Sequence, residues 1–348
     1  MAIASFLRQF SILSAAALAA AAAQAKDITV VNFGGANGNA QRAAFTQPFE
    51  KSTGHKVIAV EYNGEQAKVK AMVEAGRVTW DLVEVENGDI GRGCDEGLYE
   101  KVDYAKLGVP KSDLLPAATT ECGVGFFIWS TVLAFDASKL KSAPKNWADF
   151  WDVKKNPGKR GMRKTPVGNL EFALMADGVA AKDVYGILAT KAGVDRAFKK
   201  LDELKPSIQW WEAGAQPPQL LIAGDVVMTT AYNGRIDAAR REGRKLDIAW
   251  DGNLYDLDFW AIPKGSPNKD LALQYMGYTL ASAQQAAYAK NIPYGPTNQT
   301  ALKQLDAKVL ADLPNSAANS ANAVMMNGQF WADNGEELTK RFTAWAAK

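Results

Sequence analysis

One arginine, Arg235, stands just after a predicted strand-to-helix turn in the stretch AYNGRIDAARR. The apolar run VVMTT before the turn is typical of a strand, and the residues after it favour a helix. On an exposed helix face, Arg235 would be a solubilising charge or would pair with Asp237 or Asp256. At the mouth of a cleft, its planar guanidinium would bind a carboxylate through two charge-assisted hydrogen bonds.

Enzyme motifs are absent from the sequence. It contains no G-x-S-x-G, no H-E-x-x-H and no phosphate-binding loop of the Gly-Lys-Ser/Thr type. The stretch NFGGANGNA lacks the dinucleotide-binding spacing, and we interpret it as a close-approach loop at a helix N-terminus. The only histidine, His55, lies in a helix-to-strand turn. We therefore expect no catalytic residue, no metal site and no cofactor.

Two cysteines, Cys94 and Cys122, are the only ones in the chain. In an exported protein they favour a disulfide, worth roughly 3.5 kcal/mol of stability if it acts by restricting the unfolded chain. Two buried free thiols are the alternative. A zinc site would need more ligands than these two thiols and the distant His55.

The elements that must position these residues alternate between strand and helix. Strands are predicted at DITVVNF, HKVIAVEY and WDLVEVE, and helices at NAQRAAFTQPFEKSTG and GEQAKVKAMVEAG. This order, with continuous apolar strands, predicts an α/β fold with mainly parallel sheets flanked by helices. Because ligands of such sheets lie beyond the carboxyl ends of the strands, the segments at Phe33, Glu84, Tyr232 and Asp258 are the ones to inspect.

Two apolar segments are long enough to carry the chain between two lobes. They are GFFIWSTVLAFD, residues 125–136, and YDLDFWAIPKG, residues 255–265. Between them lie the loop-rich stretch NWADFWDVKKNPGKRGMRKTP, several predicted helices, and strands at SIQWW and VVMTTAY. Two crossings predict two discontinuous lobes hinged across a cleft.

The first 25 residues predict export. They combine one basic residue, Arg8, an apolar run over residues 10–23, and an Ala-x-Ala end at Ala23 and Ala25. The run is shorter than the roughly 20 residues of a membrane span, so we expect a signal peptide cleaved after Ala25. Without Arg8 the formal net charge falls from +2 to +1. This near balance gives no support for a nucleic acid or an anionic membrane as partner.

Several stretches, taken together and in order, resemble the periplasmic polyamine-binding proteins of ABC importers. They are FEKSTGHKV, WDLVEVE, NWADFWDVKKNPGKRGMR, GDVVMTTAYNGR and DFWAIPKGSPNKDLALQYMGYTLASAQQAAYAKNIPYGPTN. No single stretch is specific, but the set covers nearly the whole mature chain and is weakest from residue 300 onward. The resemblance implies a two-lobed receptor of the periplasmic binding protein fold. Such a receptor closes on a ligand in the inter-lobe cleft and delivers it to a membrane permease.

The chain departs from the polyamine pattern at one end of the implied cleft. Polyamine binders hold a di- or tri-cation with carboxylates at both ends, and Asp258 in LDFWAIP matches one of these. At the other end the matching positions are Val167 and Leu170, which are apolar, while Glu171 lies one residue off the pattern. The family's small polar residue after A-[WY]-N-G is replaced here by Arg235. A guanidinium facing an aspartate suits a zwitterion, as in the family's aminobutyrate-binding branch.

The resemblance also implies an aromatic lining for the cleft. Its candidates are Phe33, Trp211, Tyr232 and Tyr294, with core packing as the alternative for each. Such rings would contact the ligand's methylene groups and face its ammonium, a cation–π contact of about 0.5–2 kcal/mol. Neighbours on a strand face opposite ways, so at most one of Trp210 and Trp211 faces the ligand. Glu86 ends its strand at the cleft rim and is a second candidate for the ammonium, with a solvated loop acid as the alternative.

These inferences predict five segments. The signal peptide is 1–25, the first lobe is 26–133 and 256–300, the second lobe is 134–255, and helices in 301–348 pack on the second lobe. We expect a monomeric periplasmic receptor for a small ω-amino acid, such as γ-aminobutyrate or 5-aminovalerate, that works with an ABC permease. A polyamine receptor is the first alternative and holds if Glu171 faces the cleft and Arg235 turns away. A secreted enzyme is the second.

Overall fold

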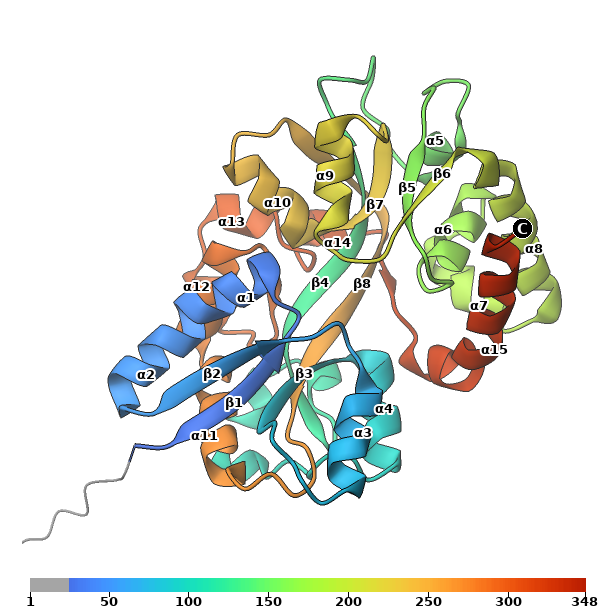
Figure 1. Ribbon diagram of the computed structural model, residues 1–348. Helices are drawn as coiled ribbons and strands as arrows, with labels where there is room; N and C mark the ends of the chain where they lie inside the picture. The colour runs from blue at the N-terminus through green and yellow to red at the C-terminus, as the bar shows by residue number, and fades with distance from the viewer. Residues whose placement is uncertain (1–24) are drawn as a thin grey trace, which may run out of the picture.

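The structure, a computed structural model, describes residues 25–348 (Figure 1). The predicted signal peptide lies outside the described residues, apart from Ala25. The described chain forms an α/β fold with one mixed sheet in the order β2-β1-β3-β8-β4-β7-β5-β6. Two further short strands pair at its middle, β9 (Gly295–Pro296) with β4 and β10 (Val324–Met325) with β8.

The first lobe begins with three parallel strands joined by helices, as predicted. The strands are β1 (Asp27–Asn32), β2 (Lys56–Glu61) and β3 (Leu82–Glu86), and the helices are α1 (Gly35–Gln41), α2 (Gln47–Thr53), α3 (Gln66–Glu74) and α4 (Asn87–Asp95). A π-helical segment, Arg42–Thr46, joins α1 to α2. Along β3, Leu82 packs in one core while Val83 and Val85 pack in another. The strand is thus buried on both faces, which explains its continuous apolar run.

Two long strands carry the chain between the lobes (Figure 1). Strand β4 (Gly123–Asp136) leaves the first lobe and β8 (Leu246–Ala261) returns to it. Because they run in opposite directions, β8 pairs antiparallel with β3 and β4, and β4 pairs antiparallel with β7. The expectation of mainly parallel sheets therefore holds for the outer strands of each lobe and not for the strands that cross.

The second lobe consists of three shorter strands with helices packed around them. The strands are β5 (Arg160–Arg163), β6 (Ile208–Trp211) and β7 (Met228–Tyr232), with β5 parallel to both others. The helices are α5 (Trp147–Trp151), α6 (Asn169–Ala176), α7 (Val184–Leu188), α8 (Lys191–Leu204), α9 (Gln216–Ala223) and α10 (Asn233–Arg241).

After β8 the chain returns to the first lobe. Helices α11 (Lys269–Leu280) and α12 (Ser282–Asn291) pack there, followed by α13 (Ala307–Ala311) and α14 (Ala317–Ser320). Leu305 and Leu313 share a small core with Ala286 and Ala289 of α12. Residues 301–313 therefore pack on α12, which differs from the prediction that the whole segment packs on the second lobe, whereas Asn319 of α14 contacts Asn253 of β8.

The last helix, α15 (Gly328–Ala346), does pack on the second lobe, beside α6, α7 and α8 (Figure 1). Its residues Trp331, Leu338 and Phe342 join that lobe's core. The ring of Trp210 on β6 packs edge-on against Phe342, with centroids 5.5 Å apart.

The pairing of the crossing strands is interrupted between the lobes. Thr131 pairs with Leu254, whereas Leu133 pairs with Ala249, so β8 has extra residues at this point. A local bulge of this kind bends and twists a strand pair. The interruption lies beside the predicted lobe boundaries at residues 133 and 255.

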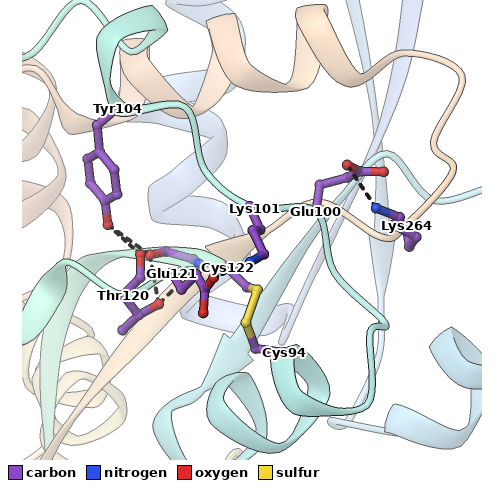
Figure 2. Close-up of a disulfide and its surroundings, with 9 residues drawn as sticks. Cys94, Glu100, Lys101, Tyr104, Thr120, Glu121, Cys122 and Lys264 are labelled. Carbon is purple, nitrogen blue, oxygen red and sulfur yellow. Dashed lines mark hydrogen bonds and ion pairs between the residues drawn. A yellow bond between two sulfur atoms is a disulfide. The ribbon is translucent and has the colours of Figure 1, made fainter.

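A disulfide joins Cys94 at the end of α4 to Cys122 just before β4 (Figure 2). Their Cα atoms are 5.6 Å apart. Nearby, the Tyr104 hydroxyl donates a hydrogen bond of 2.8 Å to the Thr120 carbonyl (Figure 2). The bridge therefore lies within the first lobe and does not connect it to the second.

Within residues 25–348, none of the helices is both long enough and apolar enough to span a bilayer. The same residues contain no group of three or more His, Cys, Asp or Glu side chains arranged to hold a metal ion.

Candidate functional site

A cavity of about 80 Å³ lies between the lobes, beyond the strand ends. Six of the seven predicted ligand-binding residues line it: Phe33, Glu86, Tyr232, Arg235, Asp258 and Tyr294. The first lobe contributes Phe33 after β1 and Glu86 at the end of β3. The second contributes Tyr232 at the end of β7 and Arg235 on α10. The cavity thus brings together residues that are up to about 260 positions apart in the chain.

Arg235 reaches this cavity because β7 ends at Tyr232 and α10 begins at Asn233. Asn233 fixes the turn, since its side chain accepts a hydrogen bond from the Ser130 N–H (3.1 Å) and donates one to the Pro293 carbonyl (2.7 Å). Arg235 is then the third residue of the helix, directly beyond the strand end. The Asn-Gly-Arg order of the sequence therefore sets the position of the guanidinium.

The Arg235 guanidinium extends from the second lobe to the first. Its Nη2 donates hydrogen bonds to the Gly34 carbonyl (3.1 Å) and, more weakly, to the Phe33 carbonyl (3.5 Å). A Cβ on Gly35 would lie 2.2 Å from Arg235 Nη1, so the predicted close-approach loop does approach closely. Gly35 also has a φ of +56°, a conformation that favours glycine.

Arg235 also retains donor capacity. Its Nε is buried and has no hydrogen-bond partner among the described residues. Asp237, one of the two candidate ion-pair partners, instead pairs with Arg241 at 2.6 Å. No ion pair of Arg235 is found in residues 25–348. An unpaired buried donor beside a cavity is what a ligand acceptor would satisfy.

Asp258 lies on β8 with its side chain 3% exposed. Its Oδ1 accepts a hydrogen bond of 2.6 Å from the indole N–H of Trp129 on β4. Glu84 is its diagonal neighbour on β3, two residues from Glu86, which pairs directly with Asp258. Burial, with the Glu84 charge adding to it, raises the pKa of Asp258 well above its usual range.

Glu84 lies behind Asp258 and has no exposed surface. Its Oε1 accepts a hydrogen bond from Asn37 (2.7 Å) and its Oε2 accepts one from Gln41 (2.7 Å), both on α1. Tyr288 donates in turn to the Asn37 side-chain oxygen (2.6 Å). This buried network holds the loop between β1 and α1 in place, and that loop is the one Arg235 contacts.

Aromatic rings enclose the remaining surface of the cavity. Tyr232 packs edge-on against Trp129, with ring centroids 5.1 Å apart. Tyr294 stacks on Phe127 at 4.8 Å, and Phe33 packs on the ring of Tyr62 at 5.0 Å. Burial raises the pKa of Tyr232 to about 12, so its hydroxyl stays neutral and available as a donor.

Trp211 lies outside this cavity. It lines an adjoining space of about 30 Å³ behind Tyr232, and the two rings meet edge-on at 5.8 Å. Trp210 points to the other side of β6 and packs on α15. The opposite orientation of the two neighbours is as expected, but the structure places Trp211 one ring away from the main cavity.

Arg163 is a cavity residue that the sequence reasoning missed. It ends β5 and lines both the main cavity and the adjoining space, with its guanidinium carbon 5.9 Å from the Tyr232 ring centroid. The signal was present in GKRGMR, because a residue at the carboxyl end of a strand is positioned to reach the cleft. Arg163 and Arg235 place two guanidinium groups around Tyr232, and Glu86 contributes a carboxylate to the same two spaces.

Glu171 points away from the cleft. It has no exposed surface, and its Oε1 accepts hydrogen bonds from Tyr185 and from the Trp331 indole, both 2.9 Å. The acid that a polyamine receptor would need at this end of the cavity is therefore part of the second lobe's core. Arg163, a cation, lines the cavity from the second lobe.

The comparisons with known proteins agree with this architecture. The model of the bacterial extracellular solute-binding protein family matches residues 44–318. The gamma-aminobutyric acid-binding protein of Pseudomonas aeruginosa is 53% identical over 340 residues, which cover 98% of this chain and 96% of that protein. The spermidine/putrescine-binding periplasmic protein of Escherichia coli K12 is 25% identical over 290 residues, which cover 76% and 77%.

Solved structures extend the likeness to the whole fold. The GABA receptor Atu4243 has a TM-score of 0.82 at 35% identity, covering 92% of this chain and 98% of that one. AgtB from A. tumefaciens R10, in complex with agropinic acid, has a TM-score of 0.84 at 32% identity, with coverage of 93% and 99%. AttC of Agrobacterium tumefaciens C58, in an open unliganded conformation, has a TM-score of 0.69 at 32% identity, with coverage of 92% and 99%.

The two lobes, the cavity between them and the match over most of the sequence lead to one assignment. This chain belongs to the family of bacterial extracellular solute-binding proteins.

Proposed function

We propose that this solute-binding protein is the receptor of an ABC importer and that its ligand is γ-aminobutyrate or a close ω-amino acid such as 5-aminovalerate. The observation that carries the proposal is the placement of Arg235 and Asp258 in one small cavity. A carboxylate at one end of the ligand satisfies the unpaired Nε of Arg235, and an ammonium at the other end faces Asp258. The methylene groups between them contact the rings of Tyr232 and Tyr294.

A polyamine fits this cavity less well. A second ammonium would face Arg235 and Arg163, and repulsion between like charges in a poorly hydrated cavity costs affinity. Glu171, which could have neutralised it, is buried on the far side of α6. The weaker identity to the polyamine-binding relative, 25% against 53%, supports the same ranking. We propose binding without turnover, since no nucleophile–base pair lines the cavity.

We further propose that the ligand closes the two lobes about a hinge in β4 and β8. The contacts of Arg235 with the Phe33 and Gly34 carbonyls support a closed form, because they join α10 of one lobe to the β1–α1 loop of the other. At an equal 32% identity, the chain matches the ligand-bound AgtB better than the open AttC. We propose that a cleaved leader, residues 1–25, directs the receptor to the periplasm. There it acts as a monomer that delivers its ligand to the permease.

Calorimetric titration tests the ligand class. Purified receptor is titrated with γ-aminobutyrate, 5-aminovalerate, putrescine, spermidine and glycine under one set of conditions. We expect saturable binding of an ω-amino acid and at least tenfold weaker binding of both polyamines, a difference of about 1.4 kcal/mol. Glycine, with its charges too close together to reach both ends of the cavity, should not compete. Tighter binding of putrescine than of either ω-amino acid would replace this proposal with the polyamine receptor.

A further inference from the structure

Four carboxyl groups lie together where β3 meets β8. Glu86 pairs with Asp258 across these antiparallel strands, and Glu84 and Asp256 lie two residues from them, on the same faces of their strands. Glu84, Asp256 and Asp258 are at most 3% exposed. None of the four forms an ion pair with a Lys or Arg anywhere in residues 25–348.

Such a group cannot be fully ionised without a counter-charge. Two carboxylates this close and this far from water repel each other, so one of them takes up a proton. Glu84 is the better anion, because Asn37 and Gln41 each donate a hydrogen bond to it. Within residues 25–348, Asp258 accepts only the Trp129 indole N–H, and Glu84 is its diagonal neighbour across the strand pair. This arrangement favours one proton on the pair, carried by Asp258.

We propose that the Glu84–Asp258 pair holds one proton in the empty receptor and that the ligand's ammonium displaces it, so that binding releases a proton. The O–H bond of Asp258 breaks, its proton passes to solvent, and an ammonium N–H donates to the carboxylate instead. The inference rests on the proposed amine ligand. It makes Glu84 a positioning residue that acts through Asp258, and it selects a cationic group over a neutral one of the same shape.

The other groups around the pair favour this state. Glu86 on β3 adds negative charge to the same cavity, which favours the proton. The cations that face the cavity are Arg235 on α10 and Arg163 on β5, and both lie beside Tyr232. Glu212, just after β6, also lines the cavity and pairs with Lys164 at 3.7 Å. The remaining neighbours lie just after β2, on β4, β7, β8, α1 and α12, and in the loop before β9. They are neutral or buried: Tyr62, Trp129, Tyr232, Asp256, Asn37, Gln41, Tyr288 and Tyr294.

The proposal fixes the sign of the pH dependence. Burial raises the pKa of both carboxyls, and the bound ammonium lowers the pKa of the pair. Affinity for the ammonium should therefore rise with pH through the titration range of the empty receptor. The change should be at most about tenfold per pH unit, because one proton is exchanged. The rise ends where the pair is already ionised, or where the ligand's amine itself deprotonates, near pH 10.

Calorimetry in buffers of different ionisation enthalpy measures the proton directly. Wild-type receptor is titrated with γ-aminobutyrate in phosphate and in Tris, at several values between about pH 6 and pH 9. We expect the observed enthalpy to depend on the buffer in the sense of release, up to one proton per ligand. Saturable binding with the same enthalpy in both buffers at every pH would overturn the proposal.

Infrared difference spectroscopy gives a readout that needs no variant. The empty receptor should show a protonated-carboxyl band that disappears when γ-aminobutyrate is added, and absence of the band would overturn the proposal. Failure of the ligand assignment is distinguishable, because it gives no saturable heat. In that case the pH is raised instead of adding ligand, and the protonated-carboxyl band of the empty receptor should disappear as the pair ionises.

Glu84→Gln separates the pair from a merely structural role. The substitution removes the second acid, so the variant should release fewer protons and show a flatter pH dependence of affinity than wild type. Glu74→Gln, on the exposed side of α3, is the matched control and should release as many protons as wild type. Equal release by Glu84→Gln and wild type would overturn the proposal. If Glu84→Gln does not fold, the two wild-type measurements decide.

Discussion

Arg235 combines two roles that depend on its length and its planar head. One edge of the guanidinium donates to the Gly34 carbonyl in the opposite lobe, and the buried Nε remains for the ligand. Lysine at this position would offer a point charge without the second edge, so the contact with the loop and the contact with the ligand could not both be kept. In the proposed complex, one side chain would therefore link recognition of the carboxylate to contact between the lobes.

Replacing Arg235 with serine should remove the carboxylate preference. The ligand's anion would be left desolvated and unpaired, which costs on the order of 2–5 kcal/mol, or roughly thirty- to several-thousand-fold in affinity. Asp258→Asn should weaken binding comparably from the ammonium side. The measurement is calorimetric titration of both variants with γ-aminobutyrate and with butylamine.

The two ligands make the comparison diagnostic. Arg235→Ser should lose most of the preference for γ-aminobutyrate over butylamine, whereas Asp258→Asn should keep discriminating at the carboxylate end. Circular dichroism checks that both variants are folded. Wild-type affinity of a folded Arg235→Ser for γ-aminobutyrate would make this arginine a bystander.

Six of the fourteen residues that line the cavity could be predicted from the sequence, and the reason is their position in the fold. Arg235, Asp258 and Glu86 follow from strand ends and from the resemblance. Trp129 could not be found this way, because it lies in the middle of an apolar strand and nothing local separates it from core residues. Glu84 belongs to an acidic strand end, but its amide partners on α1 become neighbours only in the fold.

At the scale of elements, the second lobe's α6 is fixed to α15 and α7 through one buried acid. Glu171 on α6 accepts from Trp331 of α15 and from Tyr185 of α7 through the same oxygen. Its other oxygen is buried without a partner among the described residues. Burial raises the pKa of Glu171 to about 7, so the acid is a protonated structural group over part of the physiological range.

This raised pKa predicts a loss of stability as the pH rises. The folded state binds the proton more tightly than the unfolded state, so the contribution is fully present below about pH 4.5 and is lost as the pH passes about 7. The shift corresponds to about 3 kcal/mol at most. Glu171→Gln keeps the acceptor oxygen and cannot ionise. Wild type should therefore lose stability relative to this variant between about pH 4.5 and pH 8.

Urea unfolding at several pH values checks this expectation. Glu337→Gln, on the exposed side of α15, is the control and should follow the wild-type profile. Parallel profiles for wild type and Glu171→Gln would show that the acid is already ionised in the folded receptor.

The elements themselves were predictable where local pattern decides them. The apolar runs of β1, β3 and β7 and the helices between them lie where the sequence places them. The direction of β8 was not predictable from its own residues. It depends on where the chain has been before, since β8 must return past β4. The packing of residues 301–313 on α12 was likewise missed, because a short apolar segment carries no signal for which lobe it will cover.

At the scale of the molecule, the covalent and the non-covalent constraints act on different parts. The disulfide between Cys94 and Cys122 stays within the first lobe, so it stiffens that lobe without tying it to the second (Figure 2). The lobes are joined by β4, by β8 and by the segment that leads through β10 to α15, and the pairing of β4 with β8 is interrupted between Thr131 and Leu133. Whether the two lobes close therefore depends on the groups that meet across the cleft.

Ligand should therefore compact the receptor. Without it, closure buries the Arg235 Nε with no acceptor and the carboxyl groups around Asp258 with no cation, which disfavours the closed form. A zwitterion satisfies both and stabilises closure by its differential affinity for that form. We expect the radius of gyration in solution scattering to fall when γ-aminobutyrate is added. Asp258→Asn should stay open at the same ligand concentration, while glycine leaves the wild-type profile unchanged. An unchanged profile for wild type, in a sample that calorimetry shows to be saturated, would mean that the lobes do not hinge on this ligand.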